Sequence, residues 1–356
     1  MRLNPNFCVE GVRYFVHTVH DSGNIYHMYN TLTLHGANPE NLYRAFNLPM
    51  PDKILDFSTN TNILTWPDIH INLQELASRY PDPDCSKLRM LIAEREHIPP
   101  SRILFTNGSN EAIFLLSRLF TQDTAILQPA YSEYSRAFRN LHNLFSLEDI
   151  PNFRHIIIIN PNNPTGKYSP LREVICSHPD TVFIVDEAYI DFLLTGETEK
   201  LSDLENVILL RSLTKIFHLS GARIGYVIAP ERIIAAMREL LPSWNVNAIA
   251  QELALYFLND GGFLAQTREF YAEHTPRFME ALRRAGFKAV NSDVHYFLVM
   301  ADDDLRVIEH LLRRGIVVRH TRNFEGLDGQ NKYIRIATRR PDENAILVEA
   351  MKEVYR

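Results

Sequence analysis

The sequence predicts an α/β fold in which a mostly parallel central sheet is flanked by helices, joined to a smaller α+β domain. Short β-rich segments alternate with helical stretches at residues 102–105, 124–127, 155–159, 181–185 and 207–210. This alternation is typical of parallel strands whose connecting helices cover both faces of the sheet. At 356 residues, the chain is long enough for about two domains.

One further strand, expected at residues 223–229, departs from the parallel pattern. Only seven residues separate Lys215 from Arg223. A crossover between parallel strands needs about a dozen residues or more. We therefore expect this strand to run antiparallel to the one that ends near Leu210.

The pattern changes after Pro242, where two long amphipathic helices are expected at 247–258 and 263–285, followed by strands at 295–300, 316–319 and 333–337. We predict three segments. Residues 1–62 form an N-terminal arm and a small-domain segment, residues 63–255 the large α/β domain, and residues 256–356 the C-terminal small domain. No Gly/Ser-rich linker separates the halves, so we expect the active site at their interface, beyond the carboxyl ends of the parallel strands.

Composition argues against several classes of protein. The 37 basic and 43 acidic residues give a net charge of −6 without a basic run, so nucleic acid is not an expected partner. Cys8, Cys85 and Cys176 are scattered, which fits reduced thiols in a cytoplasm and gives no support for a zinc site. No apolar run approaches the roughly 18 residues of a membrane helix, and the first residues do not resemble a secretory signal. We expect a cytoplasmic protein.

A small polar turn at residues 106–111 follows one expected strand and opens a helix. Backbone N–H groups at the positive end of a helix suit a phosphate dianion, although Ser109 or Asn110 could instead only cap the helix. A second group of possible phosphate ligands flanks Lys215 and favours the first interpretation. Together the candidate phosphate ligands are Gly108, Ser109, Asn110, Ser212, Thr214 and Arg223.

Four other side chains suggest the chemistry of pyridoxal phosphate (PLP). Lys215 could hold the cofactor aldehyde as a Schiff base, and Asp186 could keep the pyridine nitrogen protonated. Asn163 and Tyr189 could donate hydrogen bonds to the ring oxygen. A carboxylate at the end of the apolar run Phe183–Val185 is costly unless it is paired. Instead of binding a cofactor, Asp186 could form a structural salt bridge with an arginine. The loop at 160–166 could likewise be only a rigid turn that ends the strand before it.

The chain resembles the fold-type I PLP enzymes of the class I and II aminotransferase superfamily. Motifs at 163–166, 186–189 and 212–226 match the family in order, and the resemblance extends over about residues 35–350. It implies a homodimer with PLP as cofactor. It implies the roles described above for the lysine, the acid and the two ring-oxygen donors, and phosphate binding by the candidate ligands. It also implies that Tyr131 stacks on the cofactor ring and that Tyr80 contacts the cofactor phosphate in the site of a partner subunit. It also implies that Arg335 binds the substrate α-carboxylate.

Two branches of the family fit best, the histidinol-phosphate aminotransferases and the threonine-phosphate decarboxylases of cobalamin side-chain synthesis. Residues 34–38, 54–62, 186–192, 211–215 and 318–327 resemble the decarboxylases. Two features depart from that branch. Asn62-Ile63-Leu64-Thr65 replaces Asn-Pro-Leu-Gly, and about thirty residues precede the His-Gly motif at His35.

The resemblance predicts decarboxylation of a small O-phospho-L-amino acid, L-threonine O-3-phosphate or L-serine O-phosphate, for the cobamide nucleotide loop. The products would be an amino-alcohol phosphate and CO2. Decarboxylation needs the carboxylate turned out of the ring plane, and an anchored substrate phosphate can impose that rotation. The candidate anchors are His35, Asn62, Arg319 and Arg322. The alternatives are a histidinol-phosphate aminotransferase and a non-catalytic PLP-binding regulator.

Overall fold

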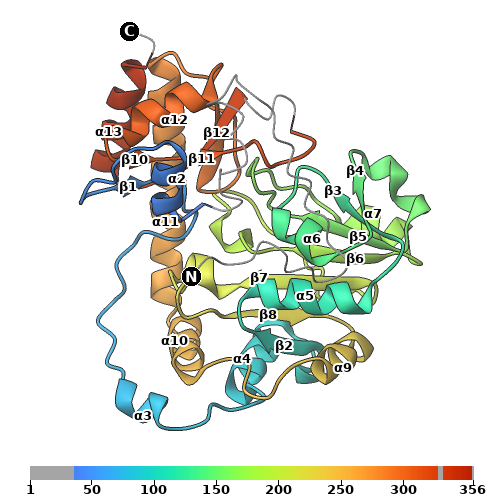
Figure 1. Ribbon diagram of the computed structural model, residues 1–356. Helices are drawn as coiled ribbons and strands as arrows, with labels where there is room; N and C mark the ends of the chain where they lie inside the picture. Colours follow the sequence, from blue (N-terminus) through green and yellow to red (C-terminus); the bar gives the residue numbers. More distant parts are fainter. Residues whose placement is uncertain (1–35, 328–331, 355–356) are drawn as a thin grey trace, which may run out of the picture.

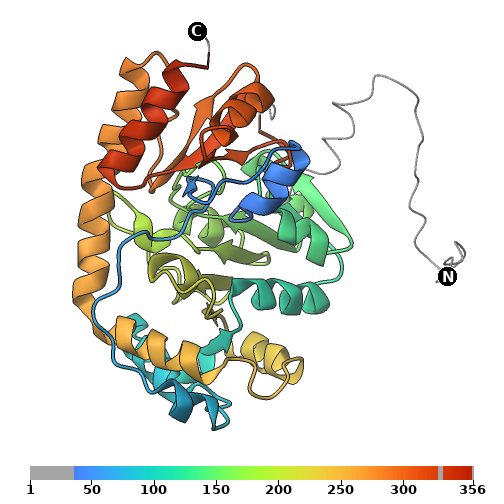
Figure 2. The same cartoon turned by 60° about the vertical axis from the view of Figure 1, so that its left-hand side comes forward.

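The computed structural model describes residues 36–327 and 332–354. A large α/β domain holds the central sheet, and a smaller domain lies against it (Figure 1). The N-terminal end of the described chain belongs to the small domain, at α2 (Pro39–Ala45) and β1 (Leu55–Asp56). From there the chain runs along the side of the molecule to α3 (Leu73–Ala77) at the opposite end, as both views show (Figures 1 and 2).

The large domain is built on a seven-stranded sheet of order β2-β8-β7-β6-β5-β3-β4. The strand β8 is antiparallel to both of its neighbours and the other pairs are parallel, which confirms the mostly parallel sheet and the predicted antiparallel strand. The edge strand β4 was not predicted, because it is short and carries exposed polar side chains. The strands are β2 (Ile103–Thr106), β3 (Thr124–Leu127), β4 (Leu141–Leu144), β5 (His155–Ile159), β6 (Val182–Asp186), β7 (Val207–Ser212) and β8 (Gly225–Ile228).

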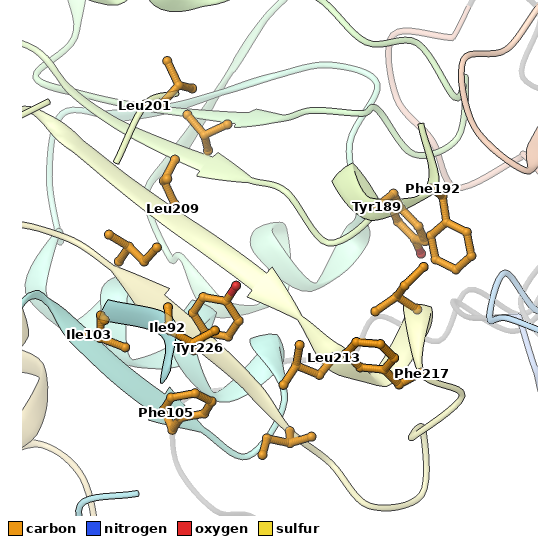
Figure 3. Packing of buried hydrophobic residues seen from close by; sticks show 14 of the residues in the cluster. Ile92, Ile103, Phe105, Tyr189, Phe192, Leu201, Leu209, Leu213, Phe217 and Tyr226 are labelled. Carbon is orange, nitrogen blue, oxygen red and sulfur yellow. The ribbon is translucent and has the colours of Figure 1, made fainter. Parts of the chain in front are cut away.

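Helices cover both faces of this sheet, because successive strand residues point to opposite sides. The two neighbouring residues Ile184 and Val185 therefore belong to different hydrophobic clusters, which lie on opposite faces of the sheet. The cluster of Val185 includes Phe105, Leu209 and Tyr226, which Figure 3 shows on neighbouring strands, and the rings of Phe105 and Tyr226 pack with their centroids 5.3 Å apart. The helices of the large domain are α4 (Ser86–Glu96), α5 (Ser109–Leu119), α6 (Ser132–Ala137), α7 (Arg172–Ser177), α8 (Leu213–Ile216) and α9 (Glu231–Glu239), with 3₁₀ turns at Pro100–Arg102, Leu147–Asn152 and Ile190–Phe192.

Two long helices lead into the small domain. Helix α10 (Ala248–Asn259) is followed by α11 (Gly261–Arg284), which runs along the side of the molecule (Figure 2). Phe263 and Tyr271 of α11 pack in the large-domain core, whereas Phe278 and Leu282 pack in the small-domain core. One helix therefore contributes to both cores, and the boundaries predicted at 62/63 and 255/256 stay a prediction.

The rest of the small domain consists of β9 (Tyr296–Met300), α12 (Asp304–Leu312), β10 (Ile316–Val317), β11 (Arg319–His320), β12 (Tyr333–Ala337) and α13 (Pro341–Lys352). The single strand predicted at 316–319 is wrong, because the chain changes partner at Val318. Before that residue, β10 forms a parallel pair with β1. After it, β11 forms an antiparallel pair with β12. This exchange aligns Arg319 with Arg335 on neighbouring strands.

In the described part of the chain, no helix has both the length and the apolar character needed to cross a membrane. Cys85 and Cys176 are free thiols, and Cys8 lies outside the described residues.

Candidate active site

A cavity of about 290 Å³ lies beyond the carboxyl ends of β5 and β6. Both domains contribute to its walls, which agrees with the predicted position. Ile159 and Asp186 end the two strands, residues 58–61 come from the segment after β1, and Arg319 and Arg335 come from the small domain. The other lining residues are Gly36, Ala37, Ser109, Asn110, Tyr131, Asn163, Ala188, Tyr189, Thr214, Lys215, Ser220, Arg223 and Phe324.

Asp186 presents a buried carboxylate to this cavity, with a residue exposure of 5%. Its Oδ2 accepts a hydrogen bond from the Tyr134 hydroxyl at 2.9 Å, and its Oδ1 accepts one from the Ala188 N–H at 3.0 Å. Burial raises the pKa of Asp186, and the two donors oppose that effect. A protonated ring nitrogen in the cavity would supply the cationic partner that a buried carboxylate requires.

Lys215 lies on the short helix α8, directly after β7, and its side chain lines the cavity. Burial and the nearby guanidinium groups of Arg335 and Arg223 lower the pKa of Lys215 to about 8. The neutral amine is therefore much more populated near neutral pH than in an ordinary lysine. A neutral amine is the form that attacks an aldehyde.

Tyr189 and Asn163, the predicted donors to a ring oxygen, both line the cavity. Burial raises the pKa of Tyr189, so its phenol stays protonated at neutral pH. The amide oxygen of Asn163 accepts a hydrogen bond from Arg335 Nη1 at 2.5 Å. The amide NH2 group of Asn163 is consequently the part of the side chain that can donate to a ligand in the cavity.

The candidate phosphate ligands converge at the N-terminus of α5. Ser109 and Asn110 line the cavity there, and Arg223 reaches the same region from the loop before β8. A Cβ atom at Gly108 would lie 2.5 Å from Arg223 Nη2, so the absence of a side chain lets the guanidinium group cross this turn. Arg223 itself adopts a left-handed conformation, with φ at 61°. Strained backbone of this kind concentrates at functional sites.

Ser212 and Thr214 complete the candidate phosphate set. Their hydroxyl groups are 2.7 Å apart beside Lys215, and Thr214 lines the cavity. Tyr131 lines the cavity too. The combination of an aldehyde-reactive lysine, a buried acid, ring-oxygen donors, an aromatic side chain and an anion cradle fits PLP.

Arg319 and Arg335 lie side by side, since they are register partners on β11 and β12. Each is 3% exposed and lines the cavity. Burial and the neighbouring charge of Arg335 lower the pKa of Arg319 to about 9. Arg335 Nη2 donates to the Ser58 carbonyl at 2.7 Å, and Arg319 Nη2 donates to Asn323 Oδ1 at 2.6 Å.

The lining is strongly positive. Its described charged groups are four cations, Lys215, Arg223, Arg319 and Arg335, and one carboxylate, Asp186. Excess positive charge at low exposure favours anionic ligands. Among the described residues, no cluster of histidine, cysteine, aspartate or glutamate is arranged to hold a metal ion.

The structure does not bring Asn62 or Arg322 into the cavity, which corrects their prediction as phosphate anchors. The amide of Asn62 donates to the Ile216 carbonyl at 2.9 Å and to Thr267 Oγ1 at 2.8 Å, so it fixes the chain next to Lys215. Arg322 forms an ion pair with the buried carboxylate of Asp304. Both side chains are held by structural partners that the sequence motif could not identify.

Tyr80 lies apart from the cavity. It is 80% exposed and stacks on Trp244 with ring centroids 4.5 Å apart. Its predicted role in the site of a partner subunit stays a prediction. His35 lies outside the described residues, as does the arm before it.

Sequence reasoning assigned no role to Ser58, Thr59, Asn60, Thr61, Phe324 or Tyr134. The first four precede Asn62 within one of the matched motifs, and Phe324 belongs to another. Tyr134 follows Tyr131 by three residues, about one helical turn. This spacing places Tyr134 on the same side of a helix as Tyr131, which lines the cavity, and it is the sequence feature that could have indicated Tyr134.

Comparison with known proteins identifies relatives of two activities. Residues 146–351 match the family model for aminotransferase class I and II. Threonine-phosphate decarboxylase from Salmonella typhimurium is 31% identical, and the match covers 90% of this chain and 96% of that protein. Histidinol-phosphate aminotransferase from Thermoanaerobacter pseudethanolicus is 30% identical, with coverage of 80% and 88%. An adenosylcobalamin biosynthesis bifunctional protein from Leptospira interrogans is 30% identical over 86% of this chain, which spans only 39% of that longer protein.

The similar solved structures also include both a decarboxylase and an aminotransferase. L-threonine-O-3-phosphate decarboxylase from Porphyromonas gingivalis superposes with a TM-score of 0.72 at 27% identity, covering 79% of this chain and 91% of that one. Histidinol-phosphate aminotransferase from Clostridium acetobutylicum gives 0.77 at 26% identity, with coverage of 85% and 99%. The chain is thus similar in fold to proteins of both activities.

Proposed function

Since the chain belongs to the class I and II aminotransferase family and uses PLP as its cofactor, we propose that it is a decarboxylase of an O-phospho-L-amino acid. The proposed substrate is L-threonine O-3-phosphate or L-serine O-phosphate, and the products are an amino-alcohol phosphate and CO2. The similarity to threonine-phosphate decarboxylase over 90% of the chain supports this reaction.

The observation that carries the proposal is the pairing of Arg319 with Arg335 in the cavity wall. In this proposal Ser109, Asn110 and Arg223 bind the cofactor phosphate. Two further buried guanidinium groups then suit a substrate with two anionic groups, a carboxylate and a phosphate. An unphosphorylated threonine or serine would supply only one of them.

The cofactor, when bound, supplies an electron sink for the bond that breaks at Cα. Lys215 would provide the amine that holds its aldehyde carbon, and Asp186 would hold the proton on its ring nitrogen. Asn163 and Tyr189 would donate hydrogen bonds to its ring oxygen. In this proposal Tyr131 stacks on the ring, and Gly108, Ser109, Asn110, Ser212, Thr214 and Arg223 form the cradle for its phosphate.

Arg335 would bind the substrate carboxylate and Arg319 the substrate phosphate. Fixing both ends of a short substrate sets its rotation about Cα, so the carboxylate can be held out of the ring plane. The C–C bond then breaks, CO2 leaves, and a proton must replace it on Cα. When the substrate amino group takes its place on the cofactor aldehyde, Lys215 Nζ would be free. As an ammonium group with a pKa lowered to about 8, it would be suited to deliver that proton.

The proposed active unit is a cytoplasmic homodimer in which Tyr80 of each subunit contacts the cofactor phosphate of the other. The similarity to a protein named for adenosylcobalamin biosynthesis supports a role in making the amino-alcohol phosphate of the cobamide nucleotide loop.

A substrate panel tests the proposal against its rivals. The PLP-loaded protein should release CO2 from O-phospho-L-threonine or O-phospho-L-serine, and much less from L-threonine or L-serine. With histidinol phosphate and 2-oxoglutarate it should form no glutamate. Glutamate without CO2 would identify an aminotransferase, and neither product from PLP-loaded protein would favour a PLP-binding regulator.

A further inference from the structure

Tyr134 is a fully buried tyrosine whose hydroxyl group forms a hydrogen bond with Asp186, the buried acid of the cavity. It lies on α6 with 0% exposure, in the core cluster that also contains Phe138 and Ile184. Its hydroxyl donates to Asp186 Oδ2 at 2.9 Å. Tyr134 does not line the cavity, so it acts on a ligand only through Asp186.

The hydrogen bond has one direction while Asp186 is ionised, because a carboxylate only accepts. Burial and the charge of Asp186 raise the pKa of Tyr134 well above its usual value, so the phenol remains a donor at any working pH. The second oxygen of Asp186 is held by the Ala188 N–H, and the Asp186 carbonyl accepts from the Asn160 N–H at 2.9 Å. Main-chain contacts thus fix the position of Asp186, and Tyr134 supplies the side-chain donor to its carboxylate.

We propose that Tyr134 is a positioning residue that keeps Asp186 ionised and oriented, so that the site selects a cofactor whose ring nitrogen carries a proton. Without the hydroxyl group, the buried carboxylate loses a donor to its charged form and can take up a proton itself. An ionised Asp186 favours a cofactor ring with a charged N–H group over a ring without one. A neutral Asp186 would lose this preference. The inference rests on the proposed pairing of Asp186 with the ring nitrogen, and it holds for either candidate reaction.

Two forms of the cofactor distinguish this role from simple packing. PLP carries a ring nitrogen, and 1-deaza-pyridoxal phosphate carries a C–H group in its place. The affinities of both should be measured on full-length apoprotein of the wild type and of Tyr134→Phe. The preference of the wild type for PLP should fall about tenfold in Tyr134→Phe, as expected for loss of one hydrogen bond to a charged group.

A matched control is Tyr43→Phe, which also removes a buried hydroxyl group. Tyr43 donates to the Leu312 carbonyl at 2.8 Å in the small-domain core. This variant should lose stability without changing the preference for PLP. In Asp186→Asn protein, adding Tyr134→Phe should not lower the preference further, because the acceptor carboxylate is already gone.

A second measurement keeps the proposal testable if either variant binds cofactor too weakly. The infrared spectrum of Tyr134→Phe apoprotein near neutral pH should contain a protonated-carboxyl band that disappears in Tyr134→Phe/Asp186→Asn. An unchanged preference for PLP, or the absence of that band, would overturn the role of Tyr134. If Asp186→Asn alone leaves the preference of the wild type intact, the pairing of Asp186 with the ring nitrogen is wrong instead.

Discussion

Arg335 donates a hydrogen bond from Nη1 to Asn163 Oδ1 at 2.5 Å, across the boundary between the two domains. Asn163 follows β5 of the large domain, and Arg335 lies on β12 of the small domain. The bond joins the proposed carboxylate-binding residue to a proposed donor for the cofactor ring. Substrate binding at Arg335 would therefore be coupled to the position of Asn163.

Replacing Arg335 should weaken substrate binding strongly. In Arg335→Gln the carboxylate loses a charged, two-pronged partner, and the expected loss in kcat/KM corresponds to about 2–5 kcal/mol. The loss should be similar for phosphorylated and unphosphorylated amino acids, because both carry the carboxylate. Steady-state kinetics on both would measure it, and a loss confined to phosphorylated substrates would reassign Arg335 to the phosphate.

Arg319→Gln should instead reduce the preference for a phosphorylated substrate. The ratio of kcat/KM for O-phospho-L-threonine over L-threonine should fall by an amount that corresponds to about 2–5 kcal/mol. Arg322→Gln is the control, since Arg322 lies three residues away and pairs with Asp304 outside the cavity. It should lower the melting temperature because it leaves a buried carboxylate unpaired, but it should leave the ratio unchanged. An equal fall in both variants would remove Arg319 from the proposed phosphate site.

The pH dependence of cofactor attachment should reveal the lowered pKa of Lys215. Only the neutral amine attacks the aldehyde, so the attachment rate in apoprotein should increase with pH and reach half of its maximum near pH 8 rather than near 10.5. Stopped-flow absorbance would follow the reaction. Arg335→Gln should move the midpoint upward, because it removes a positive charge that lowers the pKa, whereas Arg322→Gln should not. A midpoint near 10.5 in the wild type would contradict the lowered pKa.

Borohydride should then fix the cofactor covalently on the peptide that contains Lys215. Lys215→Ala should abolish turnover and this labelling. Peptide mass spectrometry that finds the reduced cofactor on another lysine would refute the site.

Tyr80 should act in the site of the partner subunit. Hybrid dimers formed from inactive Tyr80→Phe and inactive Lys215→Ala protein regenerate one intact site, so mixing under exchange conditions should restore activity. Each protein mixed with itself is the control. If mass spectrometry shows hybrids that remain inactive although Tyr80→Phe alone is inactive, the shared-site model fails.

The sequence predicted the elements whose signals are local. The short connection from Lys215 to Arg223 correctly predicted an antiparallel β8, and strand-end motifs brought Asn163, Asp186 and Lys215 to one cavity. Side-chain partners from distant parts of the chain were not predictable. Asn62 was predicted as a substrate ligand from its motif, but its amide bonds to Thr267, 205 residues away. The spacing from Tyr131 could have pointed to Tyr134, but it could not show that the partner of the Tyr134 hydroxyl group is Asp186, 52 residues away.

The reaction itself is tested most directly with O-phospho-L-threonine labelled with ¹³C in the carboxyl group. PLP-loaded protein, with no 2-oxo acid added, should release labelled CO2 and form one amino-alcohol phosphate for each CO2, measured by mass spectrometry and phosphorus NMR. O-phospho-L-serine labelled in the same way should be tested alongside, because either compound can be the substrate. No labelled CO2 from either compound, together with glutamate from histidinol phosphate and 2-oxoglutarate, would contradict the proposed decarboxylase.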